Sequence, residues 1–229
     1  MTLFIHHMAL QTPVYRKNLA AFQMVSKADT VLFPFSNTEE FFTLQRAISL
    51  AHRAHKGEKR LDGKDYLSHP LAVMRALLDT EDALPFNAYI TAILHDVLEH
   101  DPLLSGEICA LFGAKVFEAV WALSRPFKTI SQTLRDHENL YIEQMLRVQG
   151  KIPYVMLVKI SDRLHNIQNL QNLPRKKREQ CIWETQQLYL PAFKQCAVRC
   201  KDKEIAGAAF TLIDLLMKEL RDLEVEKEQ

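Results

Sequence analysis

The chain has 229 residues, of which 48% are hydrophobic and 25% charged, values typical of a globular protein and not of a disordered or fibrous one. Its 29 Lys and Arg residues nearly balance 28 Asp and Glu residues, so the net charge of +1 provides no general attraction for nucleic acid or an anionic membrane. No apolar run is long enough to cross a bilayer, and the first residues lack the order of a secretory signal, which predicts a cytoplasmic protein.

Apolar residues recur at the three- and four-residue spacing of helices along most of the chain, and no alternating strand pattern extends beyond a few residues. The few glycines fall mostly where a helix should end. Predicted helices cover residues 14–26, 37–55, 70–79, 87–100, 106–112, 115–124, 133–148, 153–172, 175–198 and 203–225. The sequence therefore predicts an all-α fold of about eight to ten helices.

The predicted helices are distributed over three segments of the chain. Residues 1–36 form an N-terminal extension with its own short helix, residues 37–200 form the helical core, and residues 201–229 form a C-terminal helix. The last residues, from Glu224 onward, have no apolar face, so we expect the end of that helix to fray.

The four cysteines are too few for a disulfide framework, and no two of them are spaced as a CxxC pair. We expect them to be buried thiols. They are Cys109, Cys181, Cys196 and Cys200.

One run of basic residues, 175–178, follows Pro174. A site for single-stranded nucleic acid interleaves such charges with aromatic side chains on which the bases stack, and this run contains none. The run therefore predicts a solvated helix start and not a nucleic-acid site.

Two polar residues interrupt the apolar helix predicted over residues 87–100. His95 and Asp96 are adjacent, and Glu99 follows His95 at the spacing of one helical turn. An imidazole and a carboxylate one turn apart lie on the same side of a helix, so both can approach one point. Burying such groups without a partner would be unfavourable, so we expect them to share one.

Two further segments contribute side chains of the same kind. His69 stands directly before Pro70, a residue that suits the first turn of a helix, which places His69 at a helix entrance. In the third segment Asp162 and Asn166 share a helix face, and Lys159 lies one turn earlier. Taken singly, each has an ordinary structural reading, since a His at a helix start often packs and an Asp beside an Arg often forms a surface ion pair.

Taken together, the three segments offer two imidazoles and two carboxylates. Such a mixed set of nitrogen and oxygen donors suits a divalent first-row ion such as Mn²⁺, Fe²⁺ or Zn²⁺. Four protein ligands also leave positions open for water and a phosphate oxygen. The candidate ligands are His69, His95, Asp96 and Asp162.

These segments resemble the HD superfamily of metal-dependent phosphohydrolases, and within it the hydrolase domain of the RelA/SpoT-type alarmone enzymes and their small stand-alone relatives. The resemblance extends in unbroken order over roughly residues 37–200 and implies a single helical HD-type bundle. It is carried by residues 51–60, Gly63, Tyr66, His69, Pro70, His95, Asp96, Glu99, residues 111–113, residues 159–166, Glu184, Thr185, Tyr189 and Pro191.

The resemblance implies a role for each matching position. One divalent metal ion, Mn²⁺ ahead of Fe²⁺ or Zn²⁺, is held by the four candidate ligands. Glu99 handles the attacking water, and His100 beside it can shuttle a proton. The substrate contacts fall on Arg60, Lys159, Asn166 and Tyr189. A helical tyrosine among apolar neighbours is as often a core residue, and the helical phase of His165 indicates packing beside the site.

The resemblance implies a metal-dependent phosphohydrolase that removes the 3′-pyrophosphate of (p)ppGpp and releases GDP or GTP with pyrophosphate. Its partner is then a small phosphorylated nucleotide, with no nucleic acid and no membrane. Two alternatives remain open. One is an HD-type nucleotidase or dinucleotide phosphatase with another substrate, and the other is a nucleotide-binding HD module with weakened catalysis.

The chain also departs from the alarmone-hydrolase pattern. His100 follows Glu99 where those enzymes carry Glu-Asp, and Leu61 follows Arg60 where they have a second basic residue. Two further positions, 168 and 169, carry Gln and Asn in place of Arg and Thr. The metal ligands are unaffected by these changes, whereas positive charge for a bis-pyrophosphate is lost, so the sequence specifies the reaction class more closely than the substrate.

Overall fold

The computed structural model describes residues 38–228 apart from residues 62, 81, 128–129 and 131. The chain divides into two compact units, residues 1–45 and 46–229. The predicted N-terminal extension, residues 1–36 with its short helix, lies outside the described residues. The structure describes only the start of helix α3 (Thr38–Ala54) from the first unit, and the remaining helices belong to the second.

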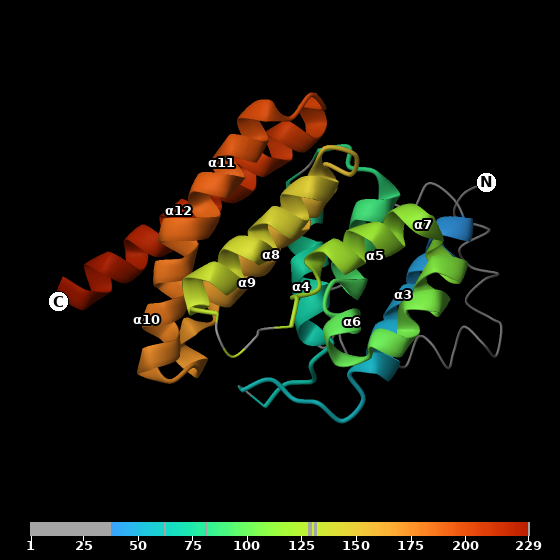
Figure 1. Cartoon of the computed structure of the whole chain (residues 1–229), viewed down its shortest axis with the longest axis horizontal. Helices are drawn as coiled ribbons and strands as arrows, with labels where there is room; N and C mark the ends of the chain where they lie inside the picture. Colours follow the sequence, from blue (N-terminus) through green and yellow to red (C-terminus); the bar gives the residue numbers. More distant parts are fainter. Residues whose placement is uncertain (1–37, 62, 81, 128–129, 131, 229) are drawn as a thin grey trace, which may run out of the picture. The chain divides into compact units, whose positions relative to one another are not determined.

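The described part of the chain consists of helices joined by short connections, with no strand beyond an isolated bridge between Lys59 and Asp65 (Figure 1). The predicted all-α fold is therefore confirmed. After α3 the α-helices are α4 (Ser68–Leu78), α5 (Phe86–Leu94), α6 (Val97–His100), α7 (Ser105–Leu123), α8 (Leu134–Gln149), α9 (Tyr154–Gln168), α10 (Arg175–Glu184), α11 (Leu190–Arg199) and α12 (Lys203–Glu228).

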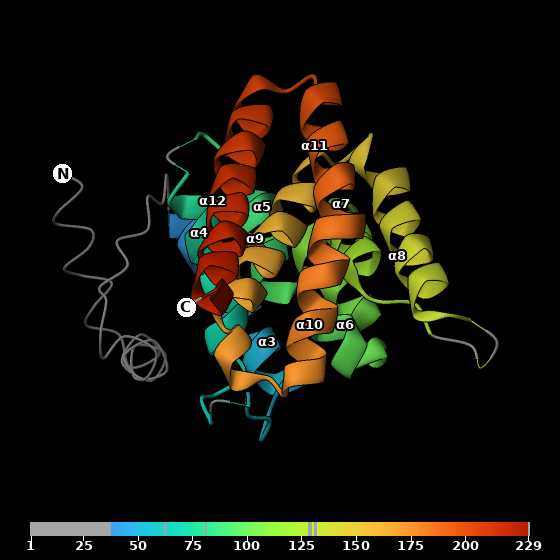
Figure 2. The same cartoon turned by 90° about the vertical axis from the view of Figure 1, so that its left-hand side faces the viewer.

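Helix α9 lies inside the second unit, where α4, α5, α8 and α12 pack against it (Figures 1 and 2). Every residue from Tyr154 to Leu164 is buried, so this helix has no solvent-facing side over three turns. Its apolar residues form the centre of the core, yet Lys159, Asp162 and Arg163 are buried with them. Buried charges require partners, and the helices around α9 have to provide them.

The helix predicted over residues 87–100 is divided into α5 and α6. His95 and Asp96 lie between the two, with φ/ψ of −57°/−33° and −97°/−7°, and the Glu99 N–H donates to the Asp96 carbonyl at 3.0 Å. The expectation of one continuous helix is therefore wrong here. The apolar periodicity continues across the break because both residues stay in the right-handed helical region.

The segment predicted as one helix over residues 175–198 contains a π-helical stretch, Thr185–Tyr189, between α10 and α11. Pro191 follows directly in the first turn of α11. Proline has no N–H to donate to a carbonyl of the preceding helical turn. A π-helical segment is one way in which a helix continues past this missing hydrogen bond. Helix α12, predicted to end near Val225, continues to Glu228.

The prediction of four buried thiols is wrong for most of the cysteines. Cys196 is buried, Cys181 and Cys200 are half-buried, and Cys109 is exposed on α7. A cysteine at an apolar helical spacing is not always on the packed face, and α7 carries other exposed apolar side chains, such as Leu111 and Trp121.

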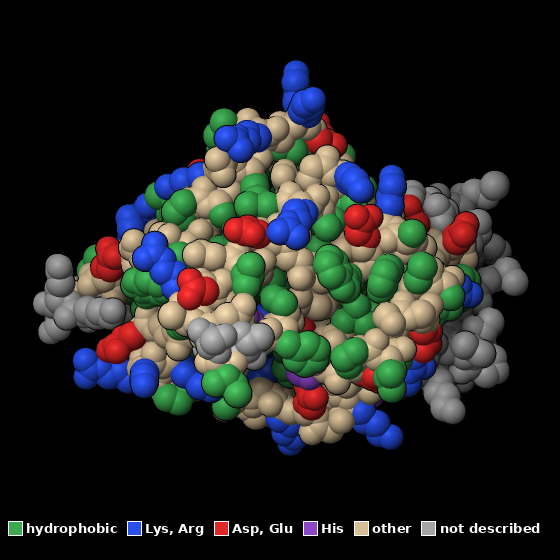
Figure 3. All heavy atoms as spheres, viewed as in Figure 1, with side chains coloured by type: hydrophobic (Ala, Val, Ile, Leu, Met, Phe, Trp, Pro, Cys, Tyr) green, Lys and Arg blue, Asp and Glu red, His purple; other side chains and the backbone are tan. Residues whose placement is uncertain are grey.

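The visible surface mixes charges of both signs, as the net charge of +1 leads one to expect (Figure 3). Lys and Arg side chains lie among Asp and Glu side chains, with apolar groups between them. Within the described residues, no helix combines the length and the apolar character needed to cross a membrane.

Gly113 interrupts α7 with φ of 83° and ψ of 166°, between the two helices predicted for this segment. A residue with a side chain is strained in this conformation, although a Cβ here would meet no atom within 4 Å. We therefore predict that Gly113→Ala lowers the free energy of unfolding by about 1–3 kcal/mol, measured by urea denaturation.

Gly106 is the matched control because it lies in the same helix, has no positive φ and is equally open. Gly106→Ala should leave stability unchanged or raise it by up to about 1 kcal/mol. Equal stability of the Gly113→Ala variant and the wild type would contradict the assignment of strain to this position.

Candidate metal centre

His69 enters the site from the first turn of α4. The Leu67 N–H donates to Oδ1 of Asp65 at 2.9 Å, and the His69 N–H donates to the carbonyl of Tyr66 at 3.0 Å. This turn and Pro70, which suits a first helical turn, fix the backbone of His69. The imidazole is 2% exposed and faces the interior.

His95 lies at the break between α5 and α6, and its orientation is fixed by one hydrogen bond. Nδ1 is 2.8 Å from the carbonyl of Ala92, and because a carbonyl only accepts, Nδ1 is the donor. The other nitrogen, Nε2, is buried and has no hydrogen-bond partner among the described residues. A buried ring nitrogen that makes no hydrogen bond is unfavourable, and either a proton or a metal cation between it and the neighbouring carboxylates satisfies it.

Asp162 extends from α9 toward the imidazoles of His69 and His95. Its Oδ1 lies 3.2 Å from Nε2 of His69 and 4.0 Å from Nε2 of His95, and accepts from Asn166 Nδ2 at 2.8 Å. Its other oxygen, Oδ2, accepts from the ammonium group of Lys159 at 2.8 Å. Donor atoms of the two imidazoles and Asp162 all lie within 4.8 Å of one another.

Asp96 completes the set of predicted ligands. Its Oδ1 is 3.2 Å from Nε2 of His95 and its Oδ2 is 3.5 Å from Nε2 of His69. Ions with metal–ligand bonds of about 2.0–2.2 Å hold neighbouring donors roughly 3.0–3.5 Å apart, which is close to the spacing found here. The structure thus brings the four residues together from three segments. His69, His95 and Asp162 have the mutual spacing that one divalent cation requires, and Asp96 contacts both imidazoles.

The electrostatics of the cluster also favour a cation. Burial would raise the pKa of Asp162, but Lys159 and the two imidazoles outweigh it and hold that pKa well below its usual range. Burial would lower the pKa of His95, whereas Asp96 and Asp162 raise it to about 9. Two ionised carboxylates therefore draw positive charge into a buried place.

Glu99 lies at the edge of this cluster on α6. Its Oε1 accepts from the backbone N–H of Arg125 at 2.6 Å, and burial and the charge of Asp96 raise its pKa. A carboxylate with a raised pKa is better matched to accepting a proton near neutral pH. Arg125 was not among the residues predicted from the sequence.

Two of the predicted substrate contacts line a pocket of about 380 Å³, in which Arg60 and Asn166 lie together with Tyr66. A larger pocket of about 500 Å³, lined by residues of α10 and α12, contains none of the predicted site residues. The smaller pocket is therefore the one lined by predicted site residues.

The other two predicted substrate contacts lie in the interior. Lys159 is 5% exposed, bound to Asp162, and Tyr189 is 0% exposed, with its hydroxyl 2.6 Å from Oε2 of Glu138. Tyr189 thus occupies the core position that its apolar neighbours in the sequence allowed. His165, expected to pack beside the site, lies with Nδ1 2.9 Å from Nδ1 of His69.

His100 was expected to act with Glu99, and the structure places its imidazole beside another carboxylate. Nδ1 of His100 is 2.9 Å from Oε2 of Glu58. The two residues are 42 positions apart, so no local spacing pattern joins them.

Tyr66 supports the cluster from outside. Its hydroxyl donates to Oδ2 of Asp96 at 3.0 Å, and burial together with the neighbouring Asp96 raises its pKa, so the hydroxyl keeps its proton. A hydrogen bond to a ligating carboxylate fixes its orientation.

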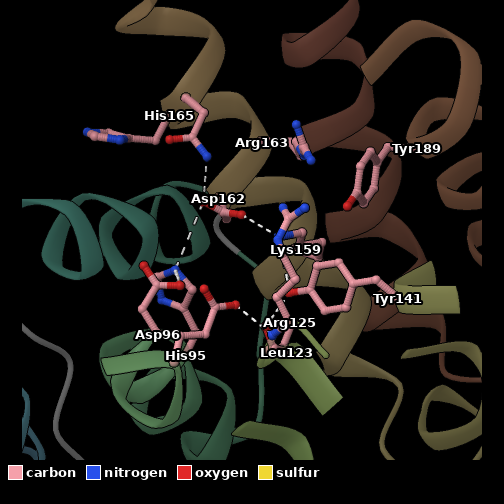
Figure 4. A network of polar contacts seen from close by, with 12 residues as sticks. His95, Asp96, Leu123, Arg125, Tyr141, Lys159, Asp162, Arg163, His165 and Tyr189 are labelled. Carbon is pink, nitrogen blue, oxygen red and sulfur yellow. Dashed lines mark hydrogen bonds and ion pairs between the residues drawn. The ribbon is translucent and has the colours of Figure 1, made fainter. Parts of the chain in front are cut away.

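A layer of buried polar side chains lies behind Asp162 (Figure 4). Lys159 extends from Asp162 toward the hydroxyl of Tyr141, which is 3.3 Å from Nζ and donates to the carbonyl of Leu123. Glu138, fully buried, is paired with Arg125, Tyr189 and Arg163. Glu138 and Tyr141 stand three positions apart on the packed face of α8. The sequence analysis did not select either residue, although a charged residue on the apolar face of a predicted helix indicates a buried polar contact.

The fold and the site define an all-helical protein with a candidate centre for a divalent metal. A family model described as HD domain matches residues 47–192, more than half of the chain. The chain belongs to the HD domain family.

The chain is similar to part of several longer proteins. It is 32% identical over 167 residues to the bifunctional (p)ppGpp synthase/hydrolase SpoT of Escherichia coli, covering 73% of this chain and 24% of that protein. It is 29% identical over 161 residues to the guanosine-3′,5′-bis(diphosphate) 3′-pyrophosphohydrolase of Haemophilus influenzae, with 70% and 24% covered. It is 28% identical over 180 residues to the GTP pyrophosphokinase of Streptomyces coelicolor, with 79% and 21% covered. The chain thus spans less than a quarter of the length of these relatives.

A solved structure described as a metazoan ortholog of SpoT that hydrolyzes ppGpp has a TM-score of 0.55 to this chain. The likeness covers 80% of this chain and 97% of the other, at 18% identity. It confirms the predicted helical HD-type bundle.

We predict that Tyr66→Phe weakens binding of Mn²⁺ about 10-fold or more, because Asp96 loses the hydrogen bond that orients it. Isothermal titration of the metal-free protein measures the affinity. Tyr89→Phe, which changes a half-buried tyrosine of α5, is the control and should bind as the wild type does. Wild-type affinity in the Tyr66→Phe variant would show that this hydroxyl does not support the centre.

We predict that Glu138→Gln lowers the free energy of unfolding at pH 7 by about 3 kcal/mol, because the buried guanidinium group of Arg163 and the partly exposed one of Arg125 lose their carboxylate. Burial would raise the pKa of Glu138, but Arg125, Tyr189 and Arg163 outweigh it and lower that pKa. The stabilisation is therefore present above the unfolded pKa of about 4.3 and lost as the pH falls through the native pKa.

Urea denaturation at two pH values measures this effect. The stability gap between wild type and Glu138→Gln should be about 1–2 kcal/mol smaller near pH 3 than at pH 7. A gap that does not change with pH would contradict an ionised Glu138 in the native state.

Proposed function

We propose that the chain is a metal-dependent phosphohydrolase that removes the 3′-pyrophosphate of (p)ppGpp, giving GDP or GTP and pyrophosphate. The observation that supports this most is the convergence of His69, His95 and Asp162 beside a pocket lined by Arg60. The names of the relatives support the choice of substrate.

The proposed ligands are His69, His95, Asp96 and Asp162, and the proposed ion is Mn²⁺, which accepts mixed imidazole and carboxylate donors. When bound, such an ion lowers the pKa of a water molecule that it holds and offsets charge on a phosphate oxygen. His95 is prepared for this role, because Nδ1 is occupied by the Ala92 carbonyl and Nε2 faces the other donors.

Glu99 takes the proton of the attacking water in this proposal. The N–H of Arg125 fixes its Oε1, and its raised pKa makes it a better acceptor near neutral pH. Neighbouring groups desolvate the carboxyl of Glu99, but part of the residue is open to solvent, so the transferred proton can then reach the leaving oxygen or solvent.

Arg60 and Asn166 recognise the substrate at the pocket. The guanidinium group of Arg60 lies 6.0 Å from the centre of the Tyr66 ring, in a loop open to solvent, where it can pair with phosphate oxygens. Lys159 instead holds Oδ2 of Asp162 from the interior, and we assign it a positioning role. This leaves Oδ1 of Asp162 directed at the imidazoles.

We predict that Glu99→Gln reduces kcat about 100-fold or more, because the amide keeps the shape of the side chain but cannot accept the proton. The metal content, measured by elemental analysis, should stay at the wild-type value. Hydrolysis at the wild-type rate would mean that another group activates the water.

Chromatography of the products after incubation with ppGpp and Mn²⁺ tests the substrate. The proposal predicts GDP and pyrophosphate, and the same assay with Asp96→Ala should show neither. Release of phosphate from other nucleotides with ppGpp left intact would identify a nucleotidase or dinucleotide phosphatase. Binding of ppGpp without product would identify a binding module.

A further inference from the structure

A second group of metal-binding side chains lies next to the candidate centre. His55 follows the end of α3, Glu58 lies in the turn after it, and His100 ends α6. One donor atom from each of the three lies within 4.8 Å of the others. We propose that these three residues form a second site for a divalent first-row cation, of the kind represented by Zn²⁺ and Co²⁺.

The first argument is the state of His55. Its imidazole is 3% exposed, and neither ring nitrogen has a hydrogen-bond partner among the described residues. Nδ1 lies 3.6 Å from Oε2 of Glu58, too far for a hydrogen bond but a suitable separation for two ligands of one ion. Burial and the neighbouring His100 lower the pKa of His55 to about 4, so the ring is neutral and its lone pair is available.

The second argument is that the surrounding structure holds the three residues in place. The ring of His55 stacks on Tyr66 at 4.3 Å and 22°, and meets the edge of His100 at 4.4 Å and 78°. The backbone N–H of Glu58 donates to the carbonyl of His55 at 3.0 Å. A ring fixed by stacking and a carboxylate fixed by its own turn reduce the entropy lost when an ion binds.

The third argument is access and donor type. The side chains of Glu58 and His100 are 40% and 24% exposed, so an ion can reach them from solvent. Two imidazoles and one carboxylate are the protein ligands of many zinc sites that keep a fourth position for water. The same donors bind Mg²⁺ weakly, since that ion prefers oxygen ligands in octahedral geometry.

Tyr66 connects the second site to the first. Its ring stacks on His55, its hydroxyl donates to Asp96, and it lines the 380 Å³ pocket. The second site therefore borders the pocket proposed to receive phosphate groups. A role of the second cation beside the phosphate groups rests on the proposed function, whereas binding of that cation does not.

The test is the number of Co²⁺ ions bound by the full-length chain after metal is removed with a chelator. Equilibrium dialysis with elemental analysis gives the stoichiometry, and visible absorption reports the coordination of the ion. We expect Glu58→Gln and His100→Gln each to bind one equivalent fewer than the wild type. His52→Gln, which changes an exposed histidine of α3, is the matched control and should bind as many as the wild type.

Both replaced side chains are partly exposed, and glutamine keeps a polar group in each place, so wild-type helicity is expected by circular dichroism. Binding of the wild-type number of ions by Glu58→Gln and His100→Gln would overturn the proposal and leave Glu58 and His100 as an ion pair only. Because the assay measures metal binding and not hydrolysis, the proposal of a second cation site can be supported even if the protein does not hydrolyse ppGpp. Asp162→Asn, which removes a ligand of the first centre, should retain the equivalent that the other two variants lose.

Discussion

The carboxylate of Asp162, which lies on the buried helix α9 and is 5% exposed, is the group on which the rest of the site depends. A buried negative charge is tolerated only when positive groups and hydrogen-bond donors face it, and here they come from several helices. Lys159 and Asn166 satisfy it from α9 itself, while His69 and His95 approach from α4 and from the break after α5. The packing of α9 against its neighbours is thus also the assembly of the candidate centre.

The layer of polar side chains behind this carboxylate holds it in position. Lys159 is held between Asp162 and the hydroxyl of Tyr141, and Tyr141 is tied to a backbone carbonyl of α7. Arg163 leaves the same helix in another direction and pairs with Glu184 at 3.2 Å. Each member has a partner, so the layer orients the ligands without leaving the charges uncompensated. The family relationship and the geometry therefore point to the same part of the chain, residues 47–192.

The sequence was sufficient for the fold class, because helical spacing carries that information. The four metal ligands stay a prediction, and the fold brings their side chains close to one another. The sequence was not sufficient for the direction of Lys159, since a helix buried on every side has no periodic face from which a direction can be read. The break at His95 and Asp96 was missed because their backbone remains nearly helical. The contact of His100 with Glu58 joins residues 42 positions apart, which only the folded chain brings together.

The central claim is that two imidazoles and two carboxylates hold one divalent cation. Anomalous diffraction from a crystal of the protein grown with Mn²⁺ tests it most directly. The account predicts a peak about 2.0–2.3 Å from Nε2 of His69, Nε2 of His95 and the nearest oxygens of Asp96 and Asp162. The claim would be contradicted if no peak appeared there at saturating Mn²⁺ and these side chains were hydrogen-bonded directly to one another.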